Sequence, residues 1–230
     1  MDLAFFVEMV PQLVDGFWTT LSLWLLSLLA GLAGAVIVAT MRMSPSLLLS
    51  APARTFLTVI RGTPLLIQVY ILYYGFGNLF AQMPSIRYSA FWPVLREGYW
   101  YAWAALTISF AAYGGEILRG GIAGVPKGEI EAARSLGLRS WMTWLLIVLP
   151  RAFRISLPAL GGQNIILLKS TVLASTITVM DLLGMANYIR MQTFKVYEPL
   201  LAVTFVFVVL TWISARVVAW LERRYSYGAR

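Results

Sequence analysis

The chain has 230 residues and contains neither cysteine nor histidine. Without cysteine it can form no disulfide and use no thiol nucleophile, so the sequence does not reveal the redox compartment. Without histidine it lacks a common zinc ligand and the base of a Ser-His-Asp triad. Charged residues are also scarce, at 12% of the chain, whereas soluble domains hold about 25%.

Apolar residues are abundant instead and make up 60% of the chain, compared with about 45–50% in soluble domains. Several charge-poor runs approach 20 residues, which is the length needed to cross a hydrocarbon core about 30 Å thick. The sequence therefore predicts an all-α integral membrane protein. Its length favours one transmembrane domain over residues 1–230, and no internal repeat is apparent.

Five transmembrane helices are predicted, at about residues 17–41, 55–80, 100–118, 154–180 and 199–221. The apolar run at 141–149 is too short to span and is interpreted as an interfacial or partner-docking helix. Tryptophan and tyrosine cluster at 92–103, as is typical of a membrane interface.

The distribution of lysine and arginine predicts the orientation, because cytoplasmic loops are enriched in both. Five spans place the two termini on opposite sides. With the N-terminus outside, the outer loops hold Arg87, Arg96, Arg190 and Lys195. The cytoplasmic side then holds a larger basic set, namely Arg42, Arg54, Arg119, Lys127, Arg134, Arg139, Arg151, Arg154, Arg223 and Arg224. We therefore expect an N-out, C-in topology.

A polar, basic segment at about 119–150 separates the third and fourth spans and carries the pattern EAA-x3-G-x9-I-x-LP. A short helix is predicted to begin near Lys127, with acidic residues in its first turn, where the helix dipole favours them. Gly137 is a natural C-cap, and a second helix over 138–149 is expected to stop at Pro150. Small residues Ala132 and Ala133 would let a partner backbone approach. A plain solvated loop is the alternative, and the seven fixed positions of the pattern disfavour it.

This segment resembles the EAA loop of binding-protein-dependent ABC importer permeases. Further stretches resemble the polar amino acid permeases of the histidine, arginine and glutamine uptake systems, namely Arg61-Gly62-Thr63-Pro64-Leu65, Tyr73-Tyr74-Gly75, Ala112-Tyr113 with Glu116-Ile117, Arg119-Gly120-Gly121-Ile122, Leu168-Lys169-Ser170-Thr171 and Leu221-Glu222-Arg223-Arg224-Tyr225. The resemblance covers nearly the whole chain. One departure follows Leu157-Pro158, where Gly162 stands in place of the usual asparagine and Asn164 comes two positions later.

The resemblance implies the type I ABC importer permease fold, with a cytoplasmic helix–Gly–helix coupling loop that seats in a cleft of an ATPase. It implies an ATPase-coupling role for Glu131, Ala132, Ala133 and Gly137. The implied partners are an ABC ATPase in two copies, a second permease subunit, identical or homologous, and a periplasmic or surface solute-binding protein, but no nucleic acid. It also implies a bacterial cytoplasmic (inner) membrane location and a cargo of polar amino acids or related compounds such as opines.

The chain itself has no recognisable nucleotide or catalytic site. Residues 162–170 end in Lys-Ser, but a phosphate-binding loop needs glycine where Leu168 stands. We therefore expect a transport subunit that is not an enzyme and binds no cofactor, with ATP and Mg held by the partner ATPase. The alternative is a secondary transporter or channel subunit not coupled to ATP, and the long docking segment disfavours it.

Two charged residues at similar depth suggest an ion pair within the membrane. Arg61 lies seven residues beyond Arg54, roughly 10 Å from the cytoplasmic boundary in a helix, and Glu116 lies about 5 Å from it. We hypothesise an Arg61–Glu116 pair that joins the second and third spans. The alternative is that each side chain extends separately to the interface.

Lys169 lies fifteen residues past Arg154, roughly 22 Å into the membrane. It could line a cavity close to a substrate carboxylate or to Asp181, because intramembrane charges usually face a pathway or a partner. It could equally hydrogen-bond to carbonyls freed by Pro158 or by the Gly161-Gly162 pair.

Two glycine-containing interruptions are predicted, at Gly62-Thr63-Pro64 and at Gly161-Gly162. Broken transporter helices expose backbone groups to solute, but small residues also serve plain helix packing. The candidate substrate path therefore comprises Lys169, Thr63, Tyr70, Gly161 and Gly162. Neighbouring aromatic side chains could line it or pack, namely Tyr73, Tyr74 and Phe76.

Overall fold

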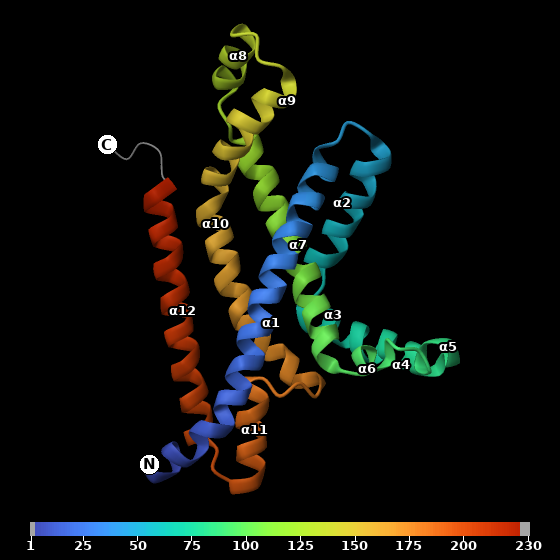
Figure 1. Ribbon diagram of the computed structural model, residues 1–230, viewed down its shortest axis with the longest axis vertical. Coiled ribbons are helices and arrows are strands. Elements are labelled where there is room, and N and C mark those ends of the chain that lie inside the picture. Colours follow the sequence, from blue (N-terminus) through green and yellow to red (C-terminus); the bar gives the residue numbers. More distant parts are fainter. Residues whose placement is uncertain (1–2, 226–230) are drawn as a thin grey trace.

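The computed structural model describes residues 3–225, and regular secondary structure over that range is entirely helical (Figure 1). The longest helices are α1 (Leu3–Met43), α2 (Leu47–Gly62), α7 (Gly98–Ala123), α10 (Leu149–Ser170) and α12 (Tyr197–Tyr225). Shorter elements connect them, namely α3 (Leu65–Tyr70), η1 (Ile71–Phe76), α4 (Gly77–Gln82), α5 (Pro84–Arg87), α6 (Trp92–Leu95), α8 (Lys127–Ser135), α9 (Ser140–Thr143), η2 (Trp144–Val148), η3 (Thr171–Ile177) and α11 (Leu182–Thr193).

Three continuous helical stretches among the described residues are long and apolar enough to cross a membrane, at Glu8–Met43, Ser140–Ile177 and Tyr197–Tyr225. A fourth arises if the bent pair Leu47–Gly62 and Leu65–Gln82 counts as one span. The remaining predicted span corresponds to α7, whose 26 residues extend about 39 Å. The sequence of α7 has alanine or glycine at many of its positions.

These small residues let α7 lie at the centre of the bundle, in contact with α1, α2 and α10. A side chain added at Gly31 or Gly34 of α1 would lie within 3 Å of Phe110 or Ala111 in α7. Such small-residue contacts are the usual means by which membrane helices approach closely. The largest buried cluster follows from this packing and combines Leu23 of α1 with Leu106 and Phe110 of α7.

The predicted second span is not a straight helix, because the chain bends by 106° between α2 and α3. The break falls at Thr63 and Pro64, as the proline predicts, and both residues have extended backbone. The buried side chain of Gln68 fills the bend. Its Nε2 lies 2.8 Å from the Ile60 carbonyl oxygen, 3.1 Å from the Thr63 carbonyl and 3.0 Å from Thr63 Oγ1.

Two predicted interruptions in the next apolar stretch are wrong. Pro150 does not stop a helix, because α9, η2, α10 and η3 form one continuous helical stretch over Ser140–Ile177. Pro150 lies in the first turn of α10, directly after the π-helical turn of η2, where proline is tolerated. The Gly161-Gly162 pair does not break α10 either.

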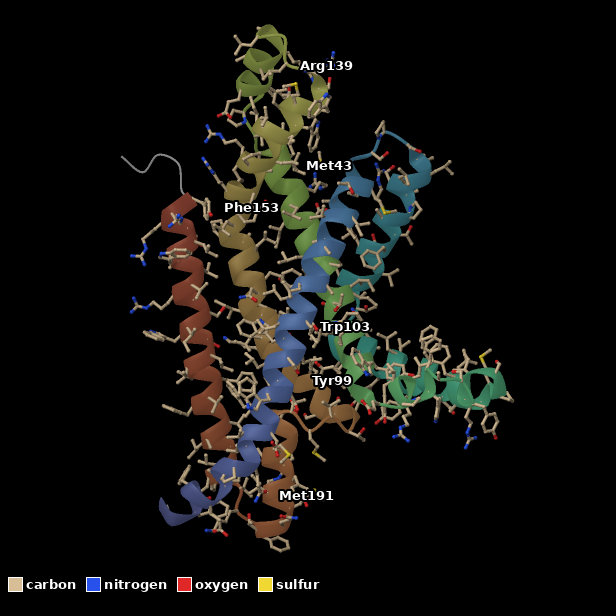
Figure 2. The ribbon with its side chains drawn as sticks, viewed as in Figure 1. Met43, Tyr99, Trp103, Arg139, Phe153 and Met191 are labelled. Atoms are coloured by element: carbon tan, nitrogen blue, oxygen red, sulfur yellow. The ribbon has the colours of Figure 1, made fainter. Side chains whose placement is uncertain are left out.

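The two ends of the molecule hold different elements (Figure 1). One end carries α8, α9, the turn between α1 and α2, and the end of α12. The opposite end carries the beginning of α1 and α11. Figure 2 shows Arg139 and Met43 toward the first end and Met191 at the other.

Candidate functional site

The predicted helix–Gly unit is present and lies at one end of the molecule, where α8 projects beyond α7 and α10 (Figure 1). Glu129 occupies its first turn, as predicted. Gly137 adopts the left-handed conformation, with φ of 76°. The Gly137 amide donates to the Arg134 carbonyl at 2.9 Å and the Leu138 amide to the Ala133 carbonyl at 3.1 Å. This pattern is a Schellman C-cap, so the prediction that Gly137 ends the helix as its C-cap is confirmed.

An ion pair fastens α8 to the beginning of α10. Arg151 Nε donates to Glu129 Oε2 at 2.8 Å, and Arg151 Nη2 donates to the other carboxylate oxygen. Both side chains are about 30% exposed. The Arg151 guanidinium lowers the pKa of the Glu129 carboxyl, chiefly through these hydrogen bonds. A buried apolar cluster of Val125, Val148 and Ala152 also helps to hold α8 against the beginning of α10.

The EAA residues divide between the two faces of α8. Glu131 and Ala132 are exposed, and so is Gly137 beyond the helix. Ala133 is only 2% exposed, so the prediction that it admits a partner backbone is wrong. Successive helix positions point about 100° apart, and this register turns Ala133 toward the chain's own core. Leu136, at 83% exposed, adds an apolar side chain to the outer surface.

The predicted Arg61–Glu116 ion pair is absent from the described residues. Glu116 Oε1 instead accepts from Arg119 Nη2 at 2.7 Å and from Arg119 Nε at 2.9 Å. Arg119 lies one helical turn away on α7, so it reaches the carboxylate without any contact between helices. Arg61 and Glu116 do line the same cavity, and the Arg61 guanidinium lies 5.4 Å from the centroid of the Tyr113 ring.

Lys169 is exposed in the last turn of α10 and lines a groove between α10 and α12 of about 520 Å³. Within residues 3–225 its ammonium group makes no hydrogen bond or ion pair with carbonyls near Pro158 or with Asp181. Thr204, Thr211 and Trp212 line the same groove, and the Thr211 hydroxyl is buried without a partner. The groove therefore brings a cation and hydroxyl groups together at the edge of the bundle.

The other candidate path residues do not join this groove. The Thr63 hydroxyl bonds the Val59 carbonyl at 2.8 Å and is held by Gln68. Tyr70 packs against the main core. Gly161 is buried where α10 meets α12, and an added Cβ would clash with Val218. Gly162 is exposed to open space. The structure thus brings Lys169 together with none of the other four.

Asn164, the displaced asparagine of the family pattern, connects three helices. Its Oδ1 accepts from Trp24 Nε1 of α1 at 2.9 Å, and its Nδ2 donates to Ser214 Oγ of α12 at 2.9 Å. Hydrogen bonds of this kind hold helices together where water is excluded.

The end opposite α8 is densely packed around Asp181, whose side chain is fully buried and caps α11. Asp181 Oδ1 accepts from the Gly184 amide at 2.8 Å, and Oδ2 is buried without a partner. Burial raises the pKa of this carboxyl to about 7, although the hydrogen bond from Gly184 opposes the rise. An added Cβ at Gly98 would lie 2.4 Å from the Ile177 carbonyl oxygen, so glycine is required there.

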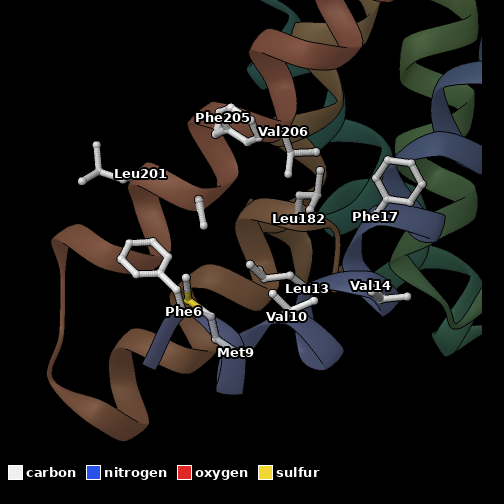
Figure 3. A pocket seen from close by; sticks show the side chains of 11 residues that line it. Phe6, Met9, Val10, Leu13, Val14, Phe17, Leu182, Leu201, Phe205 and Val206 are labelled. Atoms are coloured by element: carbon white, nitrogen blue, oxygen red, sulfur yellow. The ribbon is translucent and has the colours of Figure 1, made fainter. Parts of the chain in front are cut away.

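An apolar hollow of about 600 Å³ lies between the beginning of α1 and α12 (Figure 3). Its lining side chains are all apolar, among them Phe6, Met9, Phe17 and Phe205. A polar solute would find no hydrogen-bond partner there, so this hollow is not a candidate site for one.

The sequence analysis missed two residues that stabilise the structure, one at the bend between α2 and α3 and one at the attachment of α8 to α10. Gln68 could have been found as a polar residue within an apolar run directly after a helix break. Arg151 follows Pro150 inside the motif region, but its pairing with Glu129 depends on how α8 folds back, which residue spacing does not show.

Comparisons with known proteins match nearly the whole chain to one family of membrane transport proteins. The family described as binding-protein-dependent transport system inner membrane component matches residues 9–227. The octopine transport system permease protein OccM of Rhizobium meliloti is 39% identical, over 97% of this chain and 92% of the relative. The histidine/lysine/arginine/ornithine transport system permease protein HisM of Salmonella typhimurium is 36% identical, over 92% of this chain and 91% of the relative.

Solved structures give the same result. A chain in the crystal structure of an amino acid ABC transporter with histidines superposes with a TM-score of 0.84 at 31% identity, covering 97% of this chain and 99% of that one. The MetNI methionine ABC transporter in an inward-facing conformation shares the fold, with a TM-score of 0.76 at 17% identity. This chain therefore belongs to the family of binding-protein-dependent transport system inner membrane components.

Proposed function

We propose that the chain is the membrane-spanning subunit of an ATP-driven importer of polar amino acids or related derivatives, and that the exposed face of α8 couples it to a separate ATPase. The observation that carries the coupling role is the exposure of Glu131, Ala132 and Gly137 on an element that projects from one end of the molecule. The names of OccM and HisM support the cargo class.

The proposed topology has five crossings, with the N-terminus outside and α8 in the cytoplasm of a bacterial cell. The crossings are α1, the bent pair of α2 with α3–α4, α7, the Ser140–Ile177 stretch and α12. The charge distribution supports this topology, because the end with α8 carries most of the loop arginine and lysine.

In this mechanism the permease binds no nucleotide. ATP and Mg are held by two copies of the ATPase, and nucleotide shifts the complex between outward and inward access. A solute-binding protein delivers cargo to the outer side. A second permease subunit, identical or homologous, completes the path, because Lys169 lies exposed at the edge of this chain and a charge facing lipid is unfavourable.

The coupling role is tested with Glu131→Lys in the purified complex with its ATPase and binding protein. Reversing an exposed charge in a docking surface should lower ATPase activity stimulated by loaded binding protein at least about tenfold, equivalent to about 1.4 kcal/mol of docking. Glu222→Lys makes the same charge change at the same end but on α12, away from α8, and should leave stimulation unchanged. Normal stimulation in the Glu131 variant would exclude α8 as the coupling element.

Gly137 offers a second test of the same element. Gly137→Val should lower the stimulated ATPase activity, because a β-branched residue does not tolerate a positive φ, whereas Gly137→Asn should retain most of it. Equal activity in the two variants would show that the left-handed turn is not needed.

Screening the twenty amino acids for stimulation of the wild-type complex identifies the cargo.

A further inference from the structure

A basic cavity of about 560 Å³ lies between α1, α2 and α7, in the half of the molecule that carries α8. Three arginines line it, Arg42 in the last turn of α1 and Arg54 and Arg61 on α2. The rest of the lining is Leu57, Thr58, Gly62, Tyr113 and Glu116. None of the predicted substrate-path residues belongs to it.

The charge of this cavity is not balanced by the chain. Glu116 supplies the lining carboxylate, and Arg119 already pairs with it at 2.7 Å. Within residues 3–225, Arg42, Arg54 and Arg61 take part in no ion pair. Three guanidinium groups thus share the cavity with a single carboxylate, which already pairs with Arg119, and a ligand anion would stabilise this excess of positive charge.

The lining also has an apolar part. Arg54 and Arg61 are seven residues apart, so they lie on the same face of α2 about two turns, or roughly 10 Å, from each other. Leu57 lies between them on that face, and the Tyr113 ring lies beside the Arg61 guanidinium. A ligand that uses the whole lining therefore has an anionic group and an apolar part.

We propose that this cavity binds the phosphate-bearing headgroup of an anionic phospholipid from the leaflet at the α8 end. Arginine forks match phosphate oxygens, and basic pockets between membrane helices on the cytoplasmic side suit anionic headgroups. The position fits, since α2 lies at the flank of the bundle and contacts α1 and α7. A soluble anion would use the arginines but leave Leu57 and Tyr113 without a partner. The assignment does not depend on the amino acid carried.

The test uses the full-length chain in lipid nanodiscs of phosphatidylcholine with increasing phosphatidylglycerol, and measures the rise in thermal unfolding midpoint. Removing a basic residue near an anionic surface weakens lipid attraction about fivefold. Arg54→Gln with Arg61→Gln should therefore raise the half-saturating phosphatidylglycerol fraction about 25-fold. Arg54→Lys with Arg61→Lys should recover part of the affinity, and it keeps the test usable if the glutamine variant does not fold.

The matched control is Arg223→Gln with Arg224→Gln, which removes two charges at the same end from α12, outside the cavity. A much smaller loss in this control supports the site. An equal loss in both double variants means general charge attraction and overturns it. Inorganic phosphate or an amino acid, added to phosphatidylcholine discs, should give no shift. An equivalent shift with either one, lost in the Arg54/Arg61 variant, would make the ligand a soluble anion and overturn the lipid assignment.

Discussion

The two ends of the molecule are held together in different ways. At the α8 end, a partly exposed ion pair and one glycine turn attach a short helix to α10. At the opposite end, Asp181 is fully buried, and a side chain added at Gly98 or Gly184 would meet backbone atoms, although an apolar hollow lies nearby between α1 and α12. The comparison shows that the surface proposed to meet the ATPase rests on accessible polar contacts, whereas the far end depends on dense packing.

The largest expected effect comes from Gly98→Ala, which tests the packing of the far end. The new Cβ would lie 2.4 Å from the Ile177 carbonyl oxygen, so backbone must shift, at a cost of about 1–3 kcal/mol. Gly120→Ala is the matched control, because it lies in the same helix with nothing within 4 Å. Thermal unfolding in detergent measures both, and equal midpoints would contradict the dense packing described for this end.

A smaller effect for each pH unit is expected from the ionisation of Asp181. Because its folded pKa is raised to about 7, the folded state holds a proton that the unfolded state releases near pH 4. Stability should therefore fall as pH rises from about 4 to about 7, by up to about 1.4 kcal/mol per pH unit. Asp181→Asn keeps the helix cap and should remove this slope.

Unfolding midpoints of wild type and Asp181→Asn, measured between pH 3 and 8, test whether the Asp181 carboxyl is protonated in the folded protein. The variant should match wild type at the acidic limit and exceed it at pH 8. Parallel curves would show that Asp181 is charged in the folded protein.

The smallest effect is expected from Glu129→Gln, which removes the charge of the accessible pair. The pKa of Glu129 is lowered, so its pairing stabilises α8 above the ordinary carboxyl pKa and is lost as pH falls through the folded value. Since the chain has no cysteine, spin labels can be placed at Ser135→Cys and Phe153→Cys alone. The label distance should broaden at acidic pH in wild type and be broad at all pH values with Glu129→Gln. An unchanged distance would show that apolar contacts suffice.

Much of the fold follows from sequence pattern alone. Apolar runs predicted the long helices. The EAA pattern and Gly137 predicted α8 and its left-handed cap, because a short helix and its cap depend on local backbone preference. The predicted ABC importer permease class is confirmed by the family match and by the relatives.

The errors arose where tertiary contacts decide the outcome. Pro150 and the Gly161-Gly162 pair are helix breakers by propensity. Pro150 instead follows a π-helical turn in the first turn of α10, and Gly161 packs against Val218. Arg61 was predicted to pair with Glu116 because the two residues lie at similar depth in the membrane. Arg119, one helical turn from Glu116, is its actual partner. The inward direction of Ala133 depends on how α8 folds back, which spacing does not reveal.

The hydrogen bonds of Asn164 have a consequence for motion. They join Trp24, Asn164 and Ser214, so α1, α10 and α12 form a unit that must move together as long as these bonds persist. The bent α2–α3 pair is not tied to this unit by these bonds, and Gln68 is the polar side chain that bridges its bend. Asn164 thus ties together three helices that are distant in sequence, through two hydrogen bonds from a single side chain.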